Sequence, residues 1–356
     1  MKIEQTYYNA FEESIVAVNQ KNENEIILLF QDQTVRKHDL IYHTTKTLFS
    51  LETKIEYTDG GFDIESACSI HLLDNIIVIS NDEKTHSFVH YPEKYTIRLQ
   101  REDYYADISK FPIALYKNEN DVPHLIYATA WNRVEILNLE DCHNLTADKS
   151  LIEEDAEEKH VKYANPEKYG YHIWPSRFDY FYADLKISPD QKHFLSKGWA
   201  WGSSDAFYAF NIEDFIKNKR IKTIKVDFWE HESRAACWIS NDEIIVCCNA
   251  ILEDFDDADP DNPIEIVQYK LSGEKFEKIK RTKIPDLTDT SHEFEYSSAL
   301  QAIVSYPKAN PGLLIFDLDG KTILKNSQYN IEDFNIENLT FSSFDKHELS
   351  IYQIEF

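Results

Sequence analysis

The chain has 356 residues, with 63 Asp and Glu against 37 Lys and Arg, so its formal net charge is −26 at pH 7. A surface this acidic lacks the basic face that neutralises phosphates, which excludes nucleic acids and anionic membranes from the predicted partners. The charge is compatible with a cationic partner, but solubility is the simpler explanation and the one we favour.

Aromatic side chains are abundant, with 21 Phe, 21 Tyr and 6 Trp, which is enough to fill a large core. The N-terminal segment Met1–Gln5 shows no apolar stretch of the kind that a signal peptide requires. No apolar run approaches the length that spans a membrane. These features predict a cytoplasmic protein.

The cysteines are odd in number and show no CxxC spacing, which predicts buried, reduced thiols with no metal and no cofactor. They are Cys68, Cys142, Cys237, Cys247 and Cys248.

A short pattern recurs along the chain, in which an apolar strand ends on a polar residue followed by Leu or Ile and a turn. A repeated strand ending of this kind predicts a repeated β-unit. The five copies are Lys37-His38-Asp39-Leu40, Ile136-Leu137-Asn138-Leu139, Ala209-Phe210-Asn211-Ile212, Gln268-Tyr269-Lys270-Leu271 and Ile315-Phe316-Asp317-Leu318.

Polar turns between pairs of strands give a second repeat. Asn22 and Asp74 are 52 residues apart, as are Asp190 and Asp242. Asp345 follows Asp242 by 103 residues, which we interpret as two further units. Asp and Asn suit such turns because their side chains can bond the backbone of the turn. A fixed period of this length is typical of a repeat architecture.

The strand-like runs divide the chain into seven units. They are alternating or fully apolar segments bounded by Asn, Asp, Gly and Pro, as strands should be. We therefore predict an all-β fold, a single β-propeller domain over residues 1–356 with seven four-stranded blades. Six blades remain the alternative, because the second and sixth units are faint.

The seventh unit shows only two strands, 339–344 and 348–356, before the chain ends. A two-stranded unit would leave an open sheet edge, which invites aggregation. The N-terminal segment Lys2–Tyr8 has no unit of its own. We expect it to pair with the last strand and close the ring.

Two segments resemble WD40-like blades. One is Ser188-Pro189-Asp190-Gln191-Lys192-His193-Phe194-Leu195, continuing to Ala209–Ile212, and the other is Phe316-Asp317-Leu318-Asp319-Gly320-Lys321. The resemblance is degenerate, since the Trp-Asp and Gly-His dipeptides of strict WD40 repeats are absent from the chain. It implies four-stranded blades and a scaffold role, usually protein binding.

The region of about 148–182 departs from the repeat. The acidic run Glu153–Glu158 predicts a short exposed helix, and a series of aromatic residues follows. Long insertions often carry function, and exposed Tyr and Trp are usual anchors of binding surfaces. Packing between blades is the alternative. Our predicted partner-binding residues are Tyr171, Trp174, Phe178, Trp199 and Trp201.

The function we predict is a non-enzymatic, protein-binding scaffold or inhibitor-type propeller. An acidic immunity-type protein that caps a basic partner is one specific form of it. The chain has no nucleophile elbow, no HExxH and no glycine-rich phosphate loop, so no catalytic residue is predicted. The alternative is a propeller enzyme or a carbohydrate-binding protein with a pocket at the central channel.

An acidic segment at 253–263 carries Asp257, Asp259 and Asp261 at the alternate spacing of a calcium loop. The turn position holds Asn262 instead of Gly, and the twelfth position holds Gln268 instead of a bidentate Glu. We therefore predict that millimolar calcium leaves the melting temperature unchanged in a thermal unfolding assay. A calcium-dependent rise, abolished by Asp257→Ala with Asp259→Ala, would contradict this interpretation.

Overall fold

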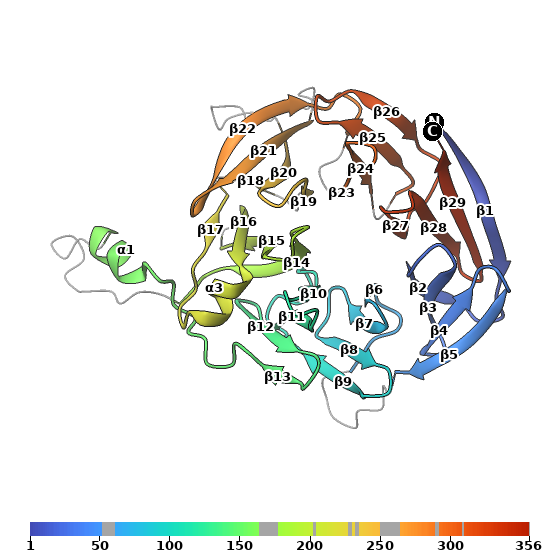
Figure 1. Ribbon diagram of the computed structural model, residues 1–356, viewed down its shortest axis with the longest axis horizontal. Helices are drawn as coiled ribbons and strands as arrows, with labels where there is room; N and C mark the ends of the chain where they lie inside the picture. The colour runs from blue at the N-terminus through green and yellow to red at the C-terminus, as the bar shows by residue number, and fades with distance from the viewer. Residues whose placement is uncertain are drawn as a thin grey trace.

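The computed structural model describes residues 1–51, 61–163, 177–201, 204–226, 230–231, 235–249, 264–288, 292–307 and 310–355. Seven antiparallel sheets stand around a central axis like the blades of a propeller (Figure 1). In each blade the first strand along the chain lies innermost and the last lies at the rim. In the seventh blade the rim strand comes instead from the start of the chain. The predicted seven-bladed all-β propeller is confirmed.

The first three blades follow one another along the chain. Blade 1 contains β2 (Ile15–Gln20), β3 (Glu25–Phe30), β4 (Thr34–Asp39) and β5 (Thr44–Ser50). Blade 2 contains β6 (Cys68–Leu73), β7 (Ile76–Asn81), β8 (His86–Tyr91) and β9 (Tyr95–Gln100). Blade 3 contains β10 (Ile113–Lys117), β11 (Pro123–Ala130), β12 (Arg133–Asn138) and β13 (His143–Asn144).

Blades 4 and 5 follow the region 148–182. Blade 4 contains β14 (Phe181–Ile187), β15 (His193–Ala200), β16 (Ser204–Asn211), β17 (Ile224–Lys225) and β18 (Glu230–His231), the last of which also pairs with β16. Blade 5 contains β19 (Ala236–Trp238), β20 (Glu243–Asn249), β21 (Ile264–Ser272) and β22 (Lys275–Lys283).

Blades 6 and 7 complete the ring. Blade 6 contains β23 (Glu293–Ser297), β24 (Ala302–Tyr306), β25 (Leu313–Asp317) and β26 (Thr322–Asn326). Blade 7 contains β27 (Asp333–Asn335), β28 (Thr340–Asp345), β29 (Glu348–Glu355) and, at the rim, β1 (Lys2–Ala10).

Two helices are described. The helix α1 (Ala156–Tyr163) begins within the acidic run and projects from the ring beside blade 4 (Figure 1). The helix α3 (Ile212–Lys217) follows β16 directly, with Asn211 as its N-cap. No helix in the described part of the chain has the length and apolarity needed to cross a membrane.

The recurring strand ending marks the third strand of its blade in all five cases. In four of the five copies the polar residue is Asp or Asn, and its side chain closes the next turn by accepting backbone N–H groups; the remaining copy has Lys270. Asp39 Oδ1 accepts from Ile41 and Tyr42 at 2.9 and 2.8 Å, and Asn138 Oδ1 accepts from Glu140 at 2.8 Å. The pattern therefore has a local cause, since a side chain that mimics the backbone terminates the strand.

The polar turns connect the first and second strands of blades 1, 2, 4 and 5, as the 52-residue spacing indicates. The equivalence of Asp345 was wrong, because Asp345 ends the second strand of blade 7. The corresponding turn of that blade follows Asn335, whose Oδ1 accepts from Glu337 and Asn338 at 3.1 and 3.0 Å. Blade 7 also has an inner strand, β27, that the sequence did not reveal.

The hydrophobic core lies between the blades. Each pair of neighbouring blades encloses a cluster of buried apolar side chains, and the described residues form seven such clusters. Inner-blade strands such as β3 are buried on both faces, with Ile26 and Leu28 packed on one side and Ile27 and Leu29 on the other. Each sheet is therefore stabilised mainly by its two neighbours, because burial of apolar area drives their packing.

The two ends of the chain meet in blade 7. The strand β1 pairs antiparallel with β29 from Lys2 opposite Glu355 to Ala10 opposite Glu348, with a register shift between Gln5 and Tyr7. The N and C termini lie together at the rim (Figure 1). Ring closure by the N-terminal segment is confirmed.

Closure by β1 can be tested by deleting residues 2–8. Because the deletion removes a rim strand and exposes the edge of β29, we expect the melting temperature to fall by roughly 5 °C or more and self-association to increase. Calorimetry and light scattering measure the two effects. Tyr8→Ser is the matched control, since this exposed side chain contributes little packing. An unchanged midpoint in the deletion variant would contradict closure.

Candidate functional site

Six aromatic rings gather at one side of the propeller, over blades 3 and 4. They come from the β9–β10 connection, the β11–β12 turn, the start of β14 and the β15–β16 hairpin. In an antiparallel blade these connections all lie at the same end of the strands. We call this group the aromatic cluster; its members are Tyr104, Tyr105, Trp131, Phe181, Trp199 and Trp201.

The rings contact one another in stacked and edge-to-face geometry. Phe181 is buried and stacks on Trp199, with 3.6 Å between ring centroids. Tyr105 meets Trp201 edge-on at 5.5 Å. Tyr104 and Trp201 are 45% and 46% exposed, so the outer rings face solvent while the inner ones support them. An exposed apolar patch of this kind is typical of an interaction site.

Local features of the sequence hold these rings in place. Gly198 sits against the backbone of Phe181 and the Tyr180 ring, where any side chain would clash, and its N–H donates to Tyr180 Oη at 2.9 Å. The β9–β10 connection wraps around the buried guanidinium of Arg101, which donates to the carbonyls of Ala106 and Ser109 at 3.0 and 2.6 Å. These contacts fix the backbone on which the exposed rings stand.

Negative charge surrounds the exposed rings. Glu102, Asp103 and Asp107 are exposed in the same connection that carries Tyr104 and Tyr105. Aromatic faces attract cations through their quadrupole, and carboxylates beside them add a favourable field. The combination suits a partner that presents Lys or Arg together with apolar groups.

The structure places three of the five predicted binding residues. Trp201 is exposed and Trp199 is half-buried, and both belong to the aromatic cluster. Phe178 is 4% exposed and packs in the core between blades 3 and 4, so it offers no area to a partner. Tyr171 and Trp174 lie outside the described residues, as does the loop 253–263.

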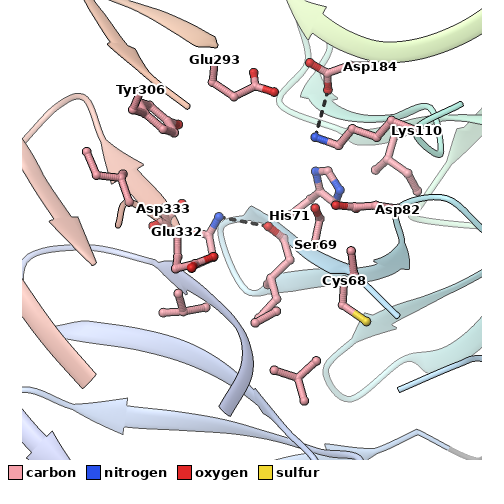
Figure 2. Close-up of a pocket in the computed structure, with 18 of the residues that line it drawn as sticks. Cys68, Ser69, His71, Asp82, Lys110, Asp184, Glu293, Tyr306, Glu332 and Asp333 are labelled. Atoms are coloured by element: carbon pink, nitrogen blue, oxygen red, sulfur yellow. Dashed lines mark hydrogen bonds and ion pairs between the residues drawn. The ribbon is translucent and has the colours of Figure 1, made fainter. Parts of the chain in front are cut away.

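A cavity of about 400 Å³ lies in the central channel. Its lining comes from six of the seven blades, mostly from their inner strands. Asp82 and Lys110 occupy strand connections on the same side as the aromatic cluster, whereas His71 and Asp184 lie deeper, within β6 and β14. Figure 2 shows these side chains converging on the cavity.

An ion-pair network forms one wall of the cavity. Lys197 Nζ is 2.9 Å from Asp184 and 3.4 Å from Glu293, and Lys186 Nζ is 3.5 and 3.4 Å from the same two carboxylates. Lys110 Nζ is 3.3 Å from Asp184. Burial alone lowers the pKa of Lys186, but the two carboxylates outweigh it and raise that pKa, so the network stays charged.

Two other lining groups have shifted protonation. Burial, reinforced by Lys110, lowers the pKa of His71 to about 4, so its imidazole is neutral at physiological pH. Burial raises the pKa of Asp333 to about 7, partly offset by the N–H of Gln20, which donates to Oδ2 at 2.7 Å. Within the described residues, no group of three or more His, Cys, Asp or Glu side chains could hold a metal ion.

Sequence reasoning missed most of these residues. Tyr104 and Tyr105 carried a weak signal, a pair of tyrosines in an acidic connection between strands. The cavity residues carried none, because Asp82, Asp184 and Asp333 are far apart in the chain and only the ring brings them together.

These features define the class of the protein as a seven-bladed β-propeller with an aromatic cluster beside a polar central cavity. No protein-family model matches the chain, and no curated protein sequence is significantly similar to it. The propeller fold is shown, whereas membership of the WD40-like family stays a prediction from the sequence.

Solved structures of virginiamycin B lyase from Staphylococcus aureus are similar in fold. The selenomethionine-substituted lyase aligns with a TM-score of 0.59 and 7% identity, covering 99% of both chains. A catalytically inactive His-to-Ala variant of that lyase, with quinupristin, aligns with a TM-score of 0.58 at the same identity and coverage. At this identity the likeness shows the fold alone.

The ion-pair network makes a stability prediction. Lys197→Met removes one ammonium group that is only 10% exposed and leaves Asp184 and Glu293 undercompensated. We expect the free energy of unfolding to fall by about 3 kcal/mol, as for other broken buried pairs. Urea unfolding measures it. Lys192→Met, on the exposed turn before β15, should change stability by less than about 0.5 kcal/mol. Equal stability of both variants would show that the network is dispensable.

Proposed function

We propose that the protein is a non-enzymatic cytoplasmic binding protein, in which one propeller domain presents the aromatic cluster to a basic protein partner. The observation that carries this proposal is the group of exposed, mutually supported rings at one side of the ring of blades. Tyr104, Tyr105 and Trp201 are each more than a third exposed. Such rings supply buried area at low cost in rotamer entropy, and a few anchors usually dominate an interface.

The chemistry of the partner follows from charge. The chain carries a formal charge of −26, and exposed carboxylates adjoin the rings in the connection 102–107. A partner with Lys or Arg beside apolar residues would gain cation–π contact, apolar burial and electrostatic steering at once. An inhibitor or immunity-type role, in which the propeller caps a basic protein, is one form of this function.

A second function is favoured by the central cavity. Ionisable side chains from several blades converge there, which suits an enzyme or a carbohydrate-binding protein that uses the channel. The solved lyase of similar fold is an enzyme by name, and this likeness adds only that the architecture can host one. The two functions differ in which residues matter, the exposed rings or the cavity lining.

The binding function is tested on the partner recovered by pull-down from the source cell. Trp201→Ala and Tyr104→Ala should each weaken its binding by about tenfold or more while the fold stays intact, because each truncates an exposed anchor. Tyr42→Ala is the matched control: Tyr42 is 76% exposed in the β4–β5 turn at the opposite end of its blade. Titration calorimetry gives the affinities, and circular dichroism gives the fold.

Salt provides an independent measure. Association of the partner should slow as ionic strength rises from 50 to 300 mM, because the acidic surface near the rings is screened. Normal affinity in both anchor variants would place the contact elsewhere. Loss of binding only on substitution of cavity residues would favour the second function.

A further inference from the structure

The central cavity has its own chemistry, separate from the aromatic cluster. Its lining includes five carboxylates, two lysines and a histidine that is neutral at physiological pH. Its volume of about 400 Å³ falls in the range of small-molecule sites. The question is which kind of molecule such a lining would hold.

The two lysines are engaged with carboxylates of their own wall. Lys110 pairs with Asp184, and Lys186 pairs with both Asp184 and Glu293. These contacts neutralise the part of the cavity that blades 3, 4 and 6 contribute. The negative charge that remains is concentrated on the walls from blade 2 and blade 7.

Asp82 represents the blade 2 wall. It forms no ion pair with any residue that the structure describes, and its buried Oδ1 accepts no hydrogen bond there. Lys110 and Arg101 attract Asp82 electrostatically, but their direct partners are other groups: Lys110 pairs with Asp184, and Arg101 donates to backbone carbonyls. A buried carboxylate oxygen with no donor is costly, and a ligand that supplies positive charge nearby would offset that cost.

Asp333 represents the blade 7 wall. Its Oδ2 accepts the backbone N–H of Gln20, and no lysine or arginine pairs with it among the described residues. Figure 2 shows Asp82 and Asp333 on opposite sides of the cavity, with His71 nearer to Asp82. Two carboxylates that face each other across a cavity suit a ligand with a positive charge at each end.

We propose that the central cavity binds a small organic diamine, whose two ammonium groups lie toward Asp82 and Asp333. A bare metal ion fits less well, because no three side chains of the His, Cys, Asp and Glu types come together among the described residues. Neutral His71 and the hydroxyl of Ser69 add polar lining without adding charge. The site does not depend on a protein partner.

Binding should depend on pH through Asp333. The groups that act on it are the Gln20 N–H from blade 1 and Glu295 and Tyr306 from blade 6, and the carboxylates of Glu293 and Glu332 line the same cavity. None of these is a cation, and burial raises the pKa of Asp333 to about 7. A diamine favours the ionised carboxylate and so releases a proton on binding. Its affinity should therefore rise from pH 6 to pH 8.

The test uses 1,4-diaminobutane as the probe, with n-butylamine and 1,4-butanediol as comparators of the same chain length. At pH 8 and low salt, calorimetry should show that the diamine binds at least tenfold more tightly than butylamine, and the diol should not bind. Lowering the pH to 6 should weaken diamine binding by about tenfold, as ionisation of a single group with a pKa near 7 requires.

Isosteric variants locate the site. Asp82→Asn and Asp333→Asn should each weaken diamine binding at least tenfold, and Asp333→Asn should also remove the pH dependence. Glu83→Gln, an exposed carboxylate next to Asp82 that does not line the cavity, is the matched control. Absence of diamine binding, equal binding of the diol, or full affinity in both Asn variants would overturn the proposal. If a variant misfolds, the pH dependence of diamine binding to the unaltered protein still tests the proposal, and an affinity that does not change between pH 6 and pH 8 would contradict it.

Discussion

The pairing of β1 with β29 is the interaction on which the rest of the structure depends. It joins residues from the two ends of the chain and turns a row of seven sheets into a closed ring. Without it, the rim of blade 7 would expose a strand edge, and blade 1 would lose the hydrogen-bonded strand pairing that joins it to blade 7 through β1. Every residue of the central cavity is positioned by this closure, because its lining comes from six blades.

Closure also explains where the charges lie. The inner strands surround the central cavity. Their side chains on that side have no neighbouring blade to pack against, and polar and charged groups line the cavity. Lys197 and Lys186 bridge Asp184 of blade 4 to Glu293 of blade 6, across the inner strand of blade 5. A buried network of this kind stabilises little in itself, but loss of one member leaves an uncompensated charge. It therefore favours one arrangement of the blades over alternatives.

The aromatic cluster and the cavity share a structural element. The β9–β10 connection carries Tyr104 and Tyr105 outward and Lys110 inward, and Arg101 holds it in shape through backbone carbonyls. Trp199 Nε1 donates to Ser109 Oγ in the same connection at 3.0 Å, which ties the hairpin of blade 4 to it. A molecule bound at either place therefore contacts a segment that also borders the other.

The sequence by itself determined the blades. Apolar runs, turn residues and the third-strand endings are local, and Asp39 or Asn138 closes its turn with atoms only two or three residues away. Local signals did not reveal β27, because this strand has only three residues. They also misplaced Asp345, which lies at the turn after the second strand of its blade and not at the turn after the first. The exposure of Trp201 was predicted, but the burial of Phe178 was not. The sequence shows that both residues are aromatic and does not show which of them faces solvent. Only the tertiary structure decided which aromatic rings lie together and which carboxylates line the same cavity. These side chains come from different blades, so ring closure and packing between the blades set their positions.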